Sequence, residues 1–417
     1  MGMSRKWWVI LLACGLGKAT AQPIAMSPDS LVDLDQRLGQ FLGASGDFDY
    51  NANTLSNAFP LAIRNGGFID RETRQRALDQ LSGNRNAAGY VLQAQLQWVG
   101  PRCTSALKGW RPLVQLAYHE LGGLQFTRDQ FAITFFGNAS YEGKKAILSP
   151  SAFTQIRYQT LGAGLQHARS KSFFRVDLVR GQSYSEVDIR NASLFTGEDG
   201  RVLRTAMLGD YFASDTAGSG LDRTNGLGMA VSGRWNTELV IGPKQIAVGV
   251  WLDDLGVVAW NDNSVSIQKD TLFNYTGWQA DNLFALDDVL IGEEQILDTF
   301  GLRYRKGSLT RLLPFRAGIE ASMAVGRAWH LGLALDHRVL PGYIPQLTAQ
   351  ASRRFGRSTQ LGGTVSYGGF GALRVGLAVK QRIGKQVLFT LSTPQVPAFV
   401  TDEARGLGLA FGVTVGF

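Results

Sequence analysis

Large apolar residues alternate with small or polar residues in many short stretches of this chain. Near the C-terminus, Leu409, Phe411 and Val413 are separated by single small or polar residues. Because successive side chains of a β-strand point to opposite faces, each such stretch predicts a strand with one apolar face and one small or polar face. The same period recurs over residues 90–98, 246–252, 315–325, 329–335, 347–351, 361–367 and 373–379.

Clusters of Gly, Asn, Asp and Pro lie between these stretches, as hairpin connections require. A soluble β-sandwich shows the same period, but its outward polar face is usually rich in charge. Here that face consists mainly of Gly, Ala, Ser, Thr and Gln, which suits a lumen, while the apolar face suits lipid. Together with the export signal described below, the pattern predicts an all-β fold, a transmembrane antiparallel β-barrel of about 14–16 strands.

Two segments break the alternation and have a helical period. Residues 70–82 begin with Asp70 as a capping residue and place Ala77 and Leu81 on one face. Residues 283–298 have a weaker helical period. We expect the first to be a periplasmic or plugging element and the second to be a loop helix. Simple decoration of the surface explains either helix equally well.

The N-terminus has the composition of an export signal. Arg5 and Lys6 precede a short apolar run, and residues 19–21 form a small-x-small cleavage site. The alternative is a lipoprotein signal in which Cys14 becomes the acylated first residue. Beyond this segment there is no run of about 18 apolar residues, which excludes a membrane-spanning helix. We therefore expect a signal peptide at 1–21, an N-terminal segment with a candidate plug helix at 22–87, and the barrel at 88–417.

The composition agrees with one exported, sheet-rich domain. The chain has 417 residues, of which 50 are glycines and only 18% are charged. No break in composition marks a second domain. The net charge is +8, but the basic residues are scattered along the chain, which argues against nucleic-acid binding. The positive excess suits contact with anionic lipid headgroups or ordinary solubility. Cleavage after Ala21 would leave Cys103 alone, which excludes a disulfide scaffold and a cysteine zinc site.

No catalytic motif occurs in the sequence. The four histidines lack metal-ligand spacing, and there is no His-Glu-x-x-His, Gly-x-Ser-x-Gly or phosphate-binding glycine loop. We therefore expect no enzyme activity, no metal site and no cofactor. His330 and Asp336 lie about 20 Å apart on one predicted strand, too far to cooperate directly. The polar residues of the inward parity are candidate lumen-lining residues, for structural pairing or solute selection: Arg316, Glu320, His330, Asp336, Arg374 and Lys380.

The last predicted strand ends with an aromatic residue on its apolar face. This arrangement resembles the insertion signal that the outer-membrane assembly machinery reads. We therefore expect that machinery and outer-membrane lipid to be partners of the chain. The residues of this signal are Phe411, Val413, Val415 and Phe417.

Several short motifs point to a family. They lie at residues 66–70 with the basic helix that follows, and at 84–90, 141–146, 158–164, 197–200 and 251–255. With these motifs the chain resembles an uncharacterised outer-membrane β-barrel family of Bacteroidota, a domain-of-unknown-function family, and is distantly similar to long-chain fatty-acid transporter barrels. The resemblance implies the outer membrane of a Gram-negative bacterium and a barrel fold. It implies no activity and no functional residue.

The small residues of the lumen-facing parity favour passive transport of small or hydrophobic molecules through the barrel. The alternative is a non-catalytic membrane scaffold or binding partner for secreted or surface proteins, which a long connection such as residues 262–298 would allow. A barrel enzyme is the least favoured function, because no credible grouping of His, Asp and Ser is present.

Overall fold

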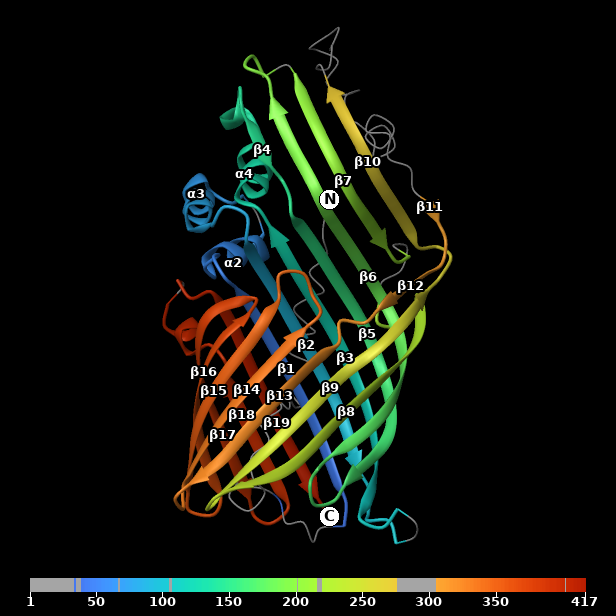
Figure 1. Cartoon of the computed structure of the whole chain (residues 1–417), viewed down its shortest axis with the longest axis vertical. Helices are drawn as coiled ribbons and strands as arrows, with labels where there is room; N and C mark the ends of the chain where they lie inside the picture. Colours follow the sequence, from blue (N-terminus) through green and yellow to red (C-terminus); the bar gives the residue numbers. More distant parts are fainter. Residues whose placement is uncertain are drawn as a thin grey trace.

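The chain forms a closed barrel of fourteen antiparallel strands (Figure 1). The computed structural model describes residue 34 and residues 39–417 apart from 67, 105–106, 201, 216–219, 276–304 and 402. Each ring strand pairs with the next, and the last pairs with β1, which closes the ring. In ring order the strands are β1 (Phe41–Ala52), β2 (Asn86–Val99), β3 (Trp110–Phe126), β5 (Ser151–His167), β6 (Phe173–Thr196), β8 (Gly226–Ile241), β9 (Lys244–Trp260), β13 (Arg316–Val325), β14 (Trp329–Arg338), β15 (Ile344–Phe355), β16 (Thr359–Gly369), β17 (Gly371–Ile383), β18 (Val387–Thr393) and β19 (Gly406–Gly416).

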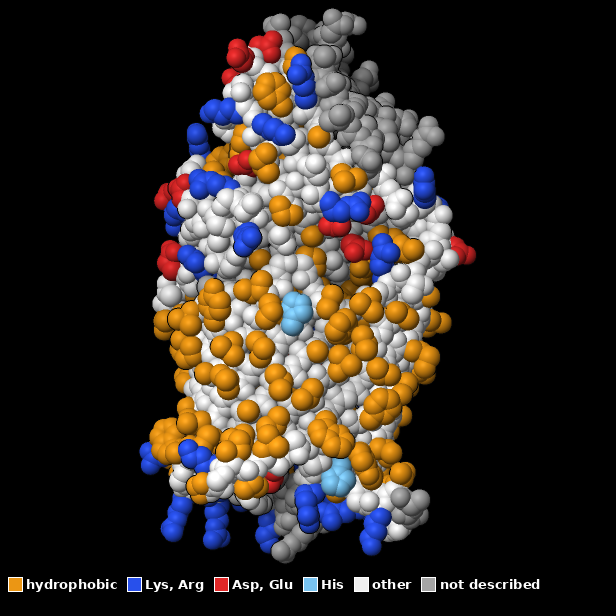
Figure 2. Space-filling view, in the orientation of Figure 1, with side chains coloured by type: hydrophobic (Ala, Val, Ile, Leu, Met, Phe, Trp, Pro, Cys, Tyr) orange, Lys and Arg blue, Asp and Glu red, His pale blue; other side chains and the backbone are white. Residues whose placement is uncertain are grey.

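The outer face of the ring is apolar and the inner face is largely polar. In β14, Leu331, Leu333 and Leu335 are 44%, 51% and 46% exposed, whereas His330 and Asp336 are only 2% and 4% exposed. On the face that Figure 2 shows, the outward apolar side chains form a broad belt over the lower half of the molecule. The predicted barrel is confirmed, and its strand number lies in the predicted range.

The two ends of the barrel differ. At the lower end in Figure 1, where the C-terminus lies, most hairpins close through turns of a few residues. Gly242, Gly326, Gly356 and Gly384 stand in these turns with φ of 60°, 65°, 62° and 61°, a left-handed conformation that glycine adopts without strain. The upper end has the long connections, as outer-membrane barrels commonly have on one side only.

Helices occupy part of the upper end. They are α2 (Ala58–Asn65), α3 (Arg71–Gln80), α4 (Arg128–Phe136) and the 3-10 turns η2 (Ala139–Tyr141) and η4 (Val396–Phe399). No helix among the described residues is long and apolar enough to cross a membrane. The predicted helix at 70–82 is confirmed as α3, and Asp70 caps it by accepting a hydrogen bond from the Thr73 N–H at 2.8 Å. The same hydrogen bonds from Thr73 lower the pKa of the Asp70 carboxyl.

Helix α3 does not plug the lumen. It packs with α2 and α4 against the upper ends of β1, β2 and β3, where Tyr50, Ala88 and Leu124 contact the cluster from strand positions of outward parity. The buried members of this cluster are Ala52, Leu55, Phe59, Ala77, Leu81, Phe126 and Phe131. The plugging role is therefore not found: α3 lies beside the barrel wall at the end opposite to the C-terminus, as surface decoration would (Figure 1).

A smaller sheet extends the wall upward. The lower part of β6 pairs with β8, and its upper part pairs with β7 (Leu203–Ala213), which in turn pairs with β10 (Val265–Tyr275). These strands rise above the ring in Figure 1. The short strands β4 (Lys145–Ile147), β11 (Arg305–Lys306) and β12 (Leu309–Leu312) complete the upper end.

The predicted start of the barrel at residue 88 is wrong. β1 pairs with β19 from Phe41 to Asn51 and with β2 from Phe41 to Ala52, so the ring already includes part of the predicted N-terminal segment. The predicted signal peptide and the predicted loop helix at 283–298 lie outside the described residues.

Candidate functional site: the lumen and the turn that crosses it

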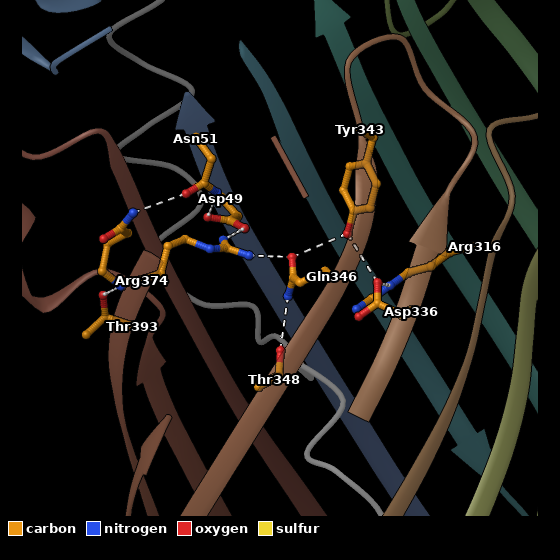
Figure 3. Close-up of polar contacts among 10 residues, drawn as sticks. Asp49, Asn51, Arg316, Asp336, Tyr343, Gln346, Thr348, Arg374 and Thr393 are labelled. Atoms are coloured by element: carbon orange, nitrogen blue, oxygen red, sulfur yellow. Dashed lines mark hydrogen bonds and ion pairs between the residues drawn. The ribbon is translucent and has the colours of Figure 1, made fainter. Parts of the chain in front are cut away.

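All six candidate lumen residues occupy inward positions of β13, β14 and β17. Glu320, His330, Asp336 and Arg374 are buried, while Arg316 and Lys380 are half-buried. Three of them belong to one network of polar side chains below the upper mouth of the barrel (Figure 3). The network's other members come from β1, from β15 and from the segment that joins β14 to β15.

The network starts at an ion pair between neighbouring strands. Arg316 Nε donates to Asp336 Oδ2 at 2.9 Å, and the Tyr343 hydroxyl donates to the same oxygen at 3.1 Å. The Tyr343 hydroxyl also lies 3.4 Å from Gln346 Oε1, which accepts from Arg374. Arg374 Nη1 donates to Asp49 Oδ2 at 3.0 Å. Figure 3 shows these contacts as one chain across the inner wall, from β13 to β1.

Sequence reasoning missed the β1 members of this network. Asn51 donates to Asp49 Oδ1 at 2.5 Å and accepts from Gln395 Nε2 at 3.3 Å. Both β1 residues lie within 22–87, the range predicted to precede the barrel. The alternation of Leu42 and Phe48, both exposed, with the inward Asp49 and Asn51 is the signal that could have found them.

The remaining candidates lie apart from this network. Glu320 forms an ion pair with Arg234 of β8. His330 is buried lower in the lumen, and neither of its ring nitrogens has a hydrogen-bond partner within the described part of the chain. Lys380 lies on β17, half-buried. No hydrogen bond joins His330 to Asp336, as their predicted separation requires.

A second buried polar group lines the opposite wall. Tyr158 donates to Asp254 Oδ2 at 2.8 Å, and the His119 ring stacks on Tyr158 with centroids 4.5 Å apart. Arg175 pairs with Asp177 at 2.6 Å between Nε and Oδ1. Sequence reasoning missed this group. For Asp254 the reason is physical: the β8–β9 pairing shifts register nearby, its φ is +59°, and a shifted register changes which residues face inward.

A turn crosses the lumen above both polar groups. Residues 339–343, which we call the strap, join β14 to β15 and contact the wall formed by β2 and β3. A methyl group added to Gly123 of β3 would lie 2.8 Å from the Pro341 carbonyl oxygen and 3.2 Å from Leu340 Cβ. One added to Gly342 would lie 2.8 Å from Ala87 Cβ. Because β3 and the strap stand on opposite sides of the ring, these contacts span the mouth.

Phe370 joins the strap from the next turn along the wall. Its buried ring lies 5.0 Å from the Tyr343 ring in an edge-on arrangement, and it fills the space that a side chain on Gly89 of β2 would need. Residues from both walls therefore form one apolar layer above the polar groups. Tyr158, whose hydroxyl belongs to the second polar group, joins that group to the layer. The other buried members of the layer are Leu121, Ile156, Val179, Tyr184, Phe212, Ala230, Val258, Trp260, Leu313, Leu340 and Phe370.

The lower part of the lumen is less tightly filled. A cavity of about 250 Å³ lies there, and inward side chains of β1, β2, β18 and β19 line it. Gln95, Gln97 and Thr414 supply polar groups, while Phe41 and Leu388 supply apolar surface. From the upper mouth downward, the described lumen thus contains an apolar layer, then the polar groups, then a cavity. No group of three or more His, Cys, Asp or Glu within the described ranges is placed to hold a metal ion.

Comparisons with known proteins place this barrel in a family. No curated protein matches the chain. Similar solved structures include a ΔS2S3 mutant of the monoaromatic hydrocarbon channel TodX, with 11% identity, a TM-score of 0.44 and 91% of each chain covered. The toluene transporter TbuX of Ralstonia pickettii has 10% identity, a TM-score of 0.40 and 95% of each chain covered. The translocator domain of autotransporter NalP from Neisseria meningitidis has 11% identity, a TM-score of 0.35 and coverage of 92% and 91%.

The sequence motifs predicted a barrel family without an assigned activity, and that prediction is confirmed. The match to the family of unknown function DUF5723 runs from residue 42 to residue 392 and includes all ring strands but the last. The chain therefore belongs to the DUF5723 family.

Proposed function

We propose that this protein lets small or hydrophobic molecules pass along its lumen, across the outer membrane of a Gram-negative bacterium. The observation that supports this best is the way in which the lumen is closed. At its upper mouth the described lumen is crossed by turn residues, the strap and Phe370, which rest on Gly123 and Gly89 of the opposite wall. These contacts can separate without breaking the strand pairing that holds the ring together.

The apolar layer selects the class of molecule that passes. An ion or a strongly hydrated solute would have to lose water to cross a layer of Leu, Ile, Val, Phe and Trp side chains, which is costly. Hydrophobic constrictions in channels close in this way, by excluding water. A small uncharged or apolar molecule instead replaces the contacts between Leu340, Phe370 and the wall with its own. We therefore expect permeants of this class.

The polar network below the layer holds the strap in position. Tyr343 is the last residue of the strap, and its hydroxyl donates to Asp336, which Arg316 also holds. The strap is thus fixed at one end to the wall from which it arises, and it is bound to the opposite wall by packing alone in the contacts described above. This asymmetry favours opening at the glycine wall.

Permeability of reconstituted barrels tests the proposal. In liposomes that contain the full chain, the double variant Leu340→Ala, Phe370→Ala should admit small uncharged solutes faster than wild type. The matched control, Leu333→Ala with Leu335→Ala, removes side chains of the exposed outer face and should leave permeability unchanged. The proposal would be contradicted if wild type, the Leu340→Ala, Phe370→Ala variant and the control all fold and are equally impermeable.

Binding of secreted or surface proteins is the second candidate. The sheet of β6, β7 and β10, together with the helices beside it, forms the upper part of the molecule (Figure 1), above the apolar belt seen in Figure 2. Affinity purification from detergent extracts tests it: a specific co-purifying protein that is lost after proteolytic trimming of the upper end supports binding. A preparation that contains the barrel alone argues against it.

A further inference from the structure

Basic residues line the lower connections of the ring: Arg102 and Lys108 lie between β2 and β3, Arg169 and Lys171 lie between β5 and β6, and four more lie in the half of the ring from β8 to β18. The turns β13–β14, β15–β16 and β17–β18 contain Arg327, Arg357 and Lys385, and Lys244 follows the turn between β8 and β9. We call these four residues the basic arc. The four turns, residues 242–243, 326–328, 356–358 and 384–386, contain no Asp or Glu. Figure 2 shows Lys and Arg side chains projecting below the apolar belt at this end.

The arc lies directly beneath exposed apolar side chains of the same hairpins. Trp329 and Phe355 are 47% and 44% exposed at the lower ends of β14 and β15. The Arg353 guanidinium lies 5.6 Å from the Trp329 ring centroid and 5.2 Å from that of Phe355. Aromatic side chains at the edge of an apolar belt mark the depth of the lipid headgroups. The charges of the arc therefore lie just beyond that depth.

Two of the turns that present the arc are braced from within the barrel. Arg354 donates to the Arg327 carbonyl at 3.3 Å, and Arg382 donates to the Arg357 carbonyl at 2.9 Å. The side chains of the arc are exposed, and none of them forms an ion pair with a carboxylate of the described residues. The positive charge of this rim is thus held in place and is not neutralised by the described chain.

We propose that the basic arc binds the headgroups of anionic phospholipids in the leaflet at the lower end of the barrel. Both parts of such a lipid are matched: acyl chains meet the apolar belt, and the phosphate meets arginine and lysine at its edge. A soluble acidic partner would use the charges but not the adjoining aromatic residues. Each arc residue contributes separately, so removal of one charge should weaken the binding of anionic lipid roughly fivefold.

Native mass spectrometry of the full chain in mixed micelles tests the proposal. The micelles contain equal amounts of phosphatidylglycerol and phosphatidylcholine, and the measurement is the ratio of the two lipids retained on the barrel. Wild type should retain phosphatidylglycerol preferentially. The variant Arg327→Gln, Arg357→Gln, Lys385→Gln should lose this preference by about tenfold or more. The matched control Arg85→Gln, Lys144→Gln, Lys145→Gln removes three exposed charges from the upper end and should behave as wild type.

Three results would overturn the proposal. The first is equal phosphatidylglycerol retention by wild type and the arc variant. The second is an equal loss in the control variant, which would assign the effect to net charge. The third is displacement of the lipid by inorganic phosphate but not by chloride of equal ionic strength, which would assign the arc to a soluble anion. If the arc variant does not fold, the salt dependence of wild type tests the proposal. The preference of wild type for phosphatidylglycerol should fall as the salt concentration is raised, and a preference that is independent of salt would contradict the proposal.

Discussion

The substitution Gly123→Val tests the closure of the lumen from the wall instead of from the strap. Gly123 pairs with Gly89 of β2 and Thr154 of β5, so its backbone is fixed within the ring. A Cβ there would lie 2.8 Å from the Pro341 carbonyl oxygen and 3.2 Å from both Leu340 Cβ and Phe370 Cε1. Valine suits a strand, so the clash falls on the strap and Phe370 and not on the wall.

The magnitude follows from where the clash acts. Overpacking a well-packed site costs about 1–3 kcal/mol. Because the added methyl groups meet Leu340 and Pro341 only while the strap rests on the wall, this cost falls on the closed state alone. A shift of about 1–3 kcal/mol changes the ratio of closed to open barrels by roughly 5- to 150-fold. The strand pairing of the ring should remain intact.

Uptake of a small uncharged solute by liposomes measures the effect, and heat-modifiable gel mobility shows that each variant is folded. Gly363→Val is the matched control, because a Cβ at Gly363 of β16 meets nothing closer than the Gly376 carbonyl oxygen at 3.9 Å. Gly123→Val should raise uptake and Gly363→Val should not. A folded Gly123→Val barrel with the permeability of wild type would refute the reasoning.

Three further outcomes follow from individual contacts. Asp336→Asn removes the carboxylate that Arg316 and Tyr343 share, and should lower the free energy of unfolding in urea by about 1–3 kcal/mol; an unchanged midpoint would contradict this. Phe417→Ala should reduce the folded fraction recovered from membranes, whereas Phe399→Ala, which alters an exposed aromatic residue of η4, should not; equal recovery argues against the insertion signal. Because hydrogen bonds from Thr73 lower the pKa of Asp70 below 3.8, they stabilise α3 fully above pH 3.8 and progressively less as the pH falls through the lowered value. Hydrogen exchange of the α3 amides should accelerate over that range beyond its intrinsic pH dependence, and unchanged protection would disprove the capping role.

The strands of the C-terminal half could be predicted because lipid imposes one rule on every one of them. In β14 the outward positions from Trp329 to Leu335 are apolar, and in β17 those from Leu373 to Val379 are apolar, so the period of two in the sequence gives both the strand and its inward face. The inward positions of Arg316, Asp336 and Arg374 followed from that parity. The capping role of Asp70 could be predicted equally well, since a helix cap depends on residues three positions apart.

The strap and the basic arc could not be predicted, because each depends on residues far apart in the sequence. Residues 340–342 read as an ordinary hairpin connection, and the partner that lets them fold inward is Gly123 on the opposite wall. The basic arc has one charge on each of several turns, which looks scattered along the chain. Only closure of the ring brings these charges to one rim. The register shift between β8 and β9 also hid the inward position of Asp254 from a strict period of two.

The orientation of the strand faces is the claim on which the account depends most, and spin labels along β14 measure it directly. Single cysteines at positions 331, 333 and 335, and then at 330, 334 and 336, are labelled in reconstituted bilayers after Cys103→Ser. The account predicts that labels at the odd positions collide with oxygen dissolved in hydrocarbon and are shielded from a water-soluble nickel complex, while labels at the even positions are shielded from the hydrocarbon. Free access of the nickel complex to positions 331, 333 and 335 would show that water covers the apolar belt, and would contradict a membrane-spanning barrel.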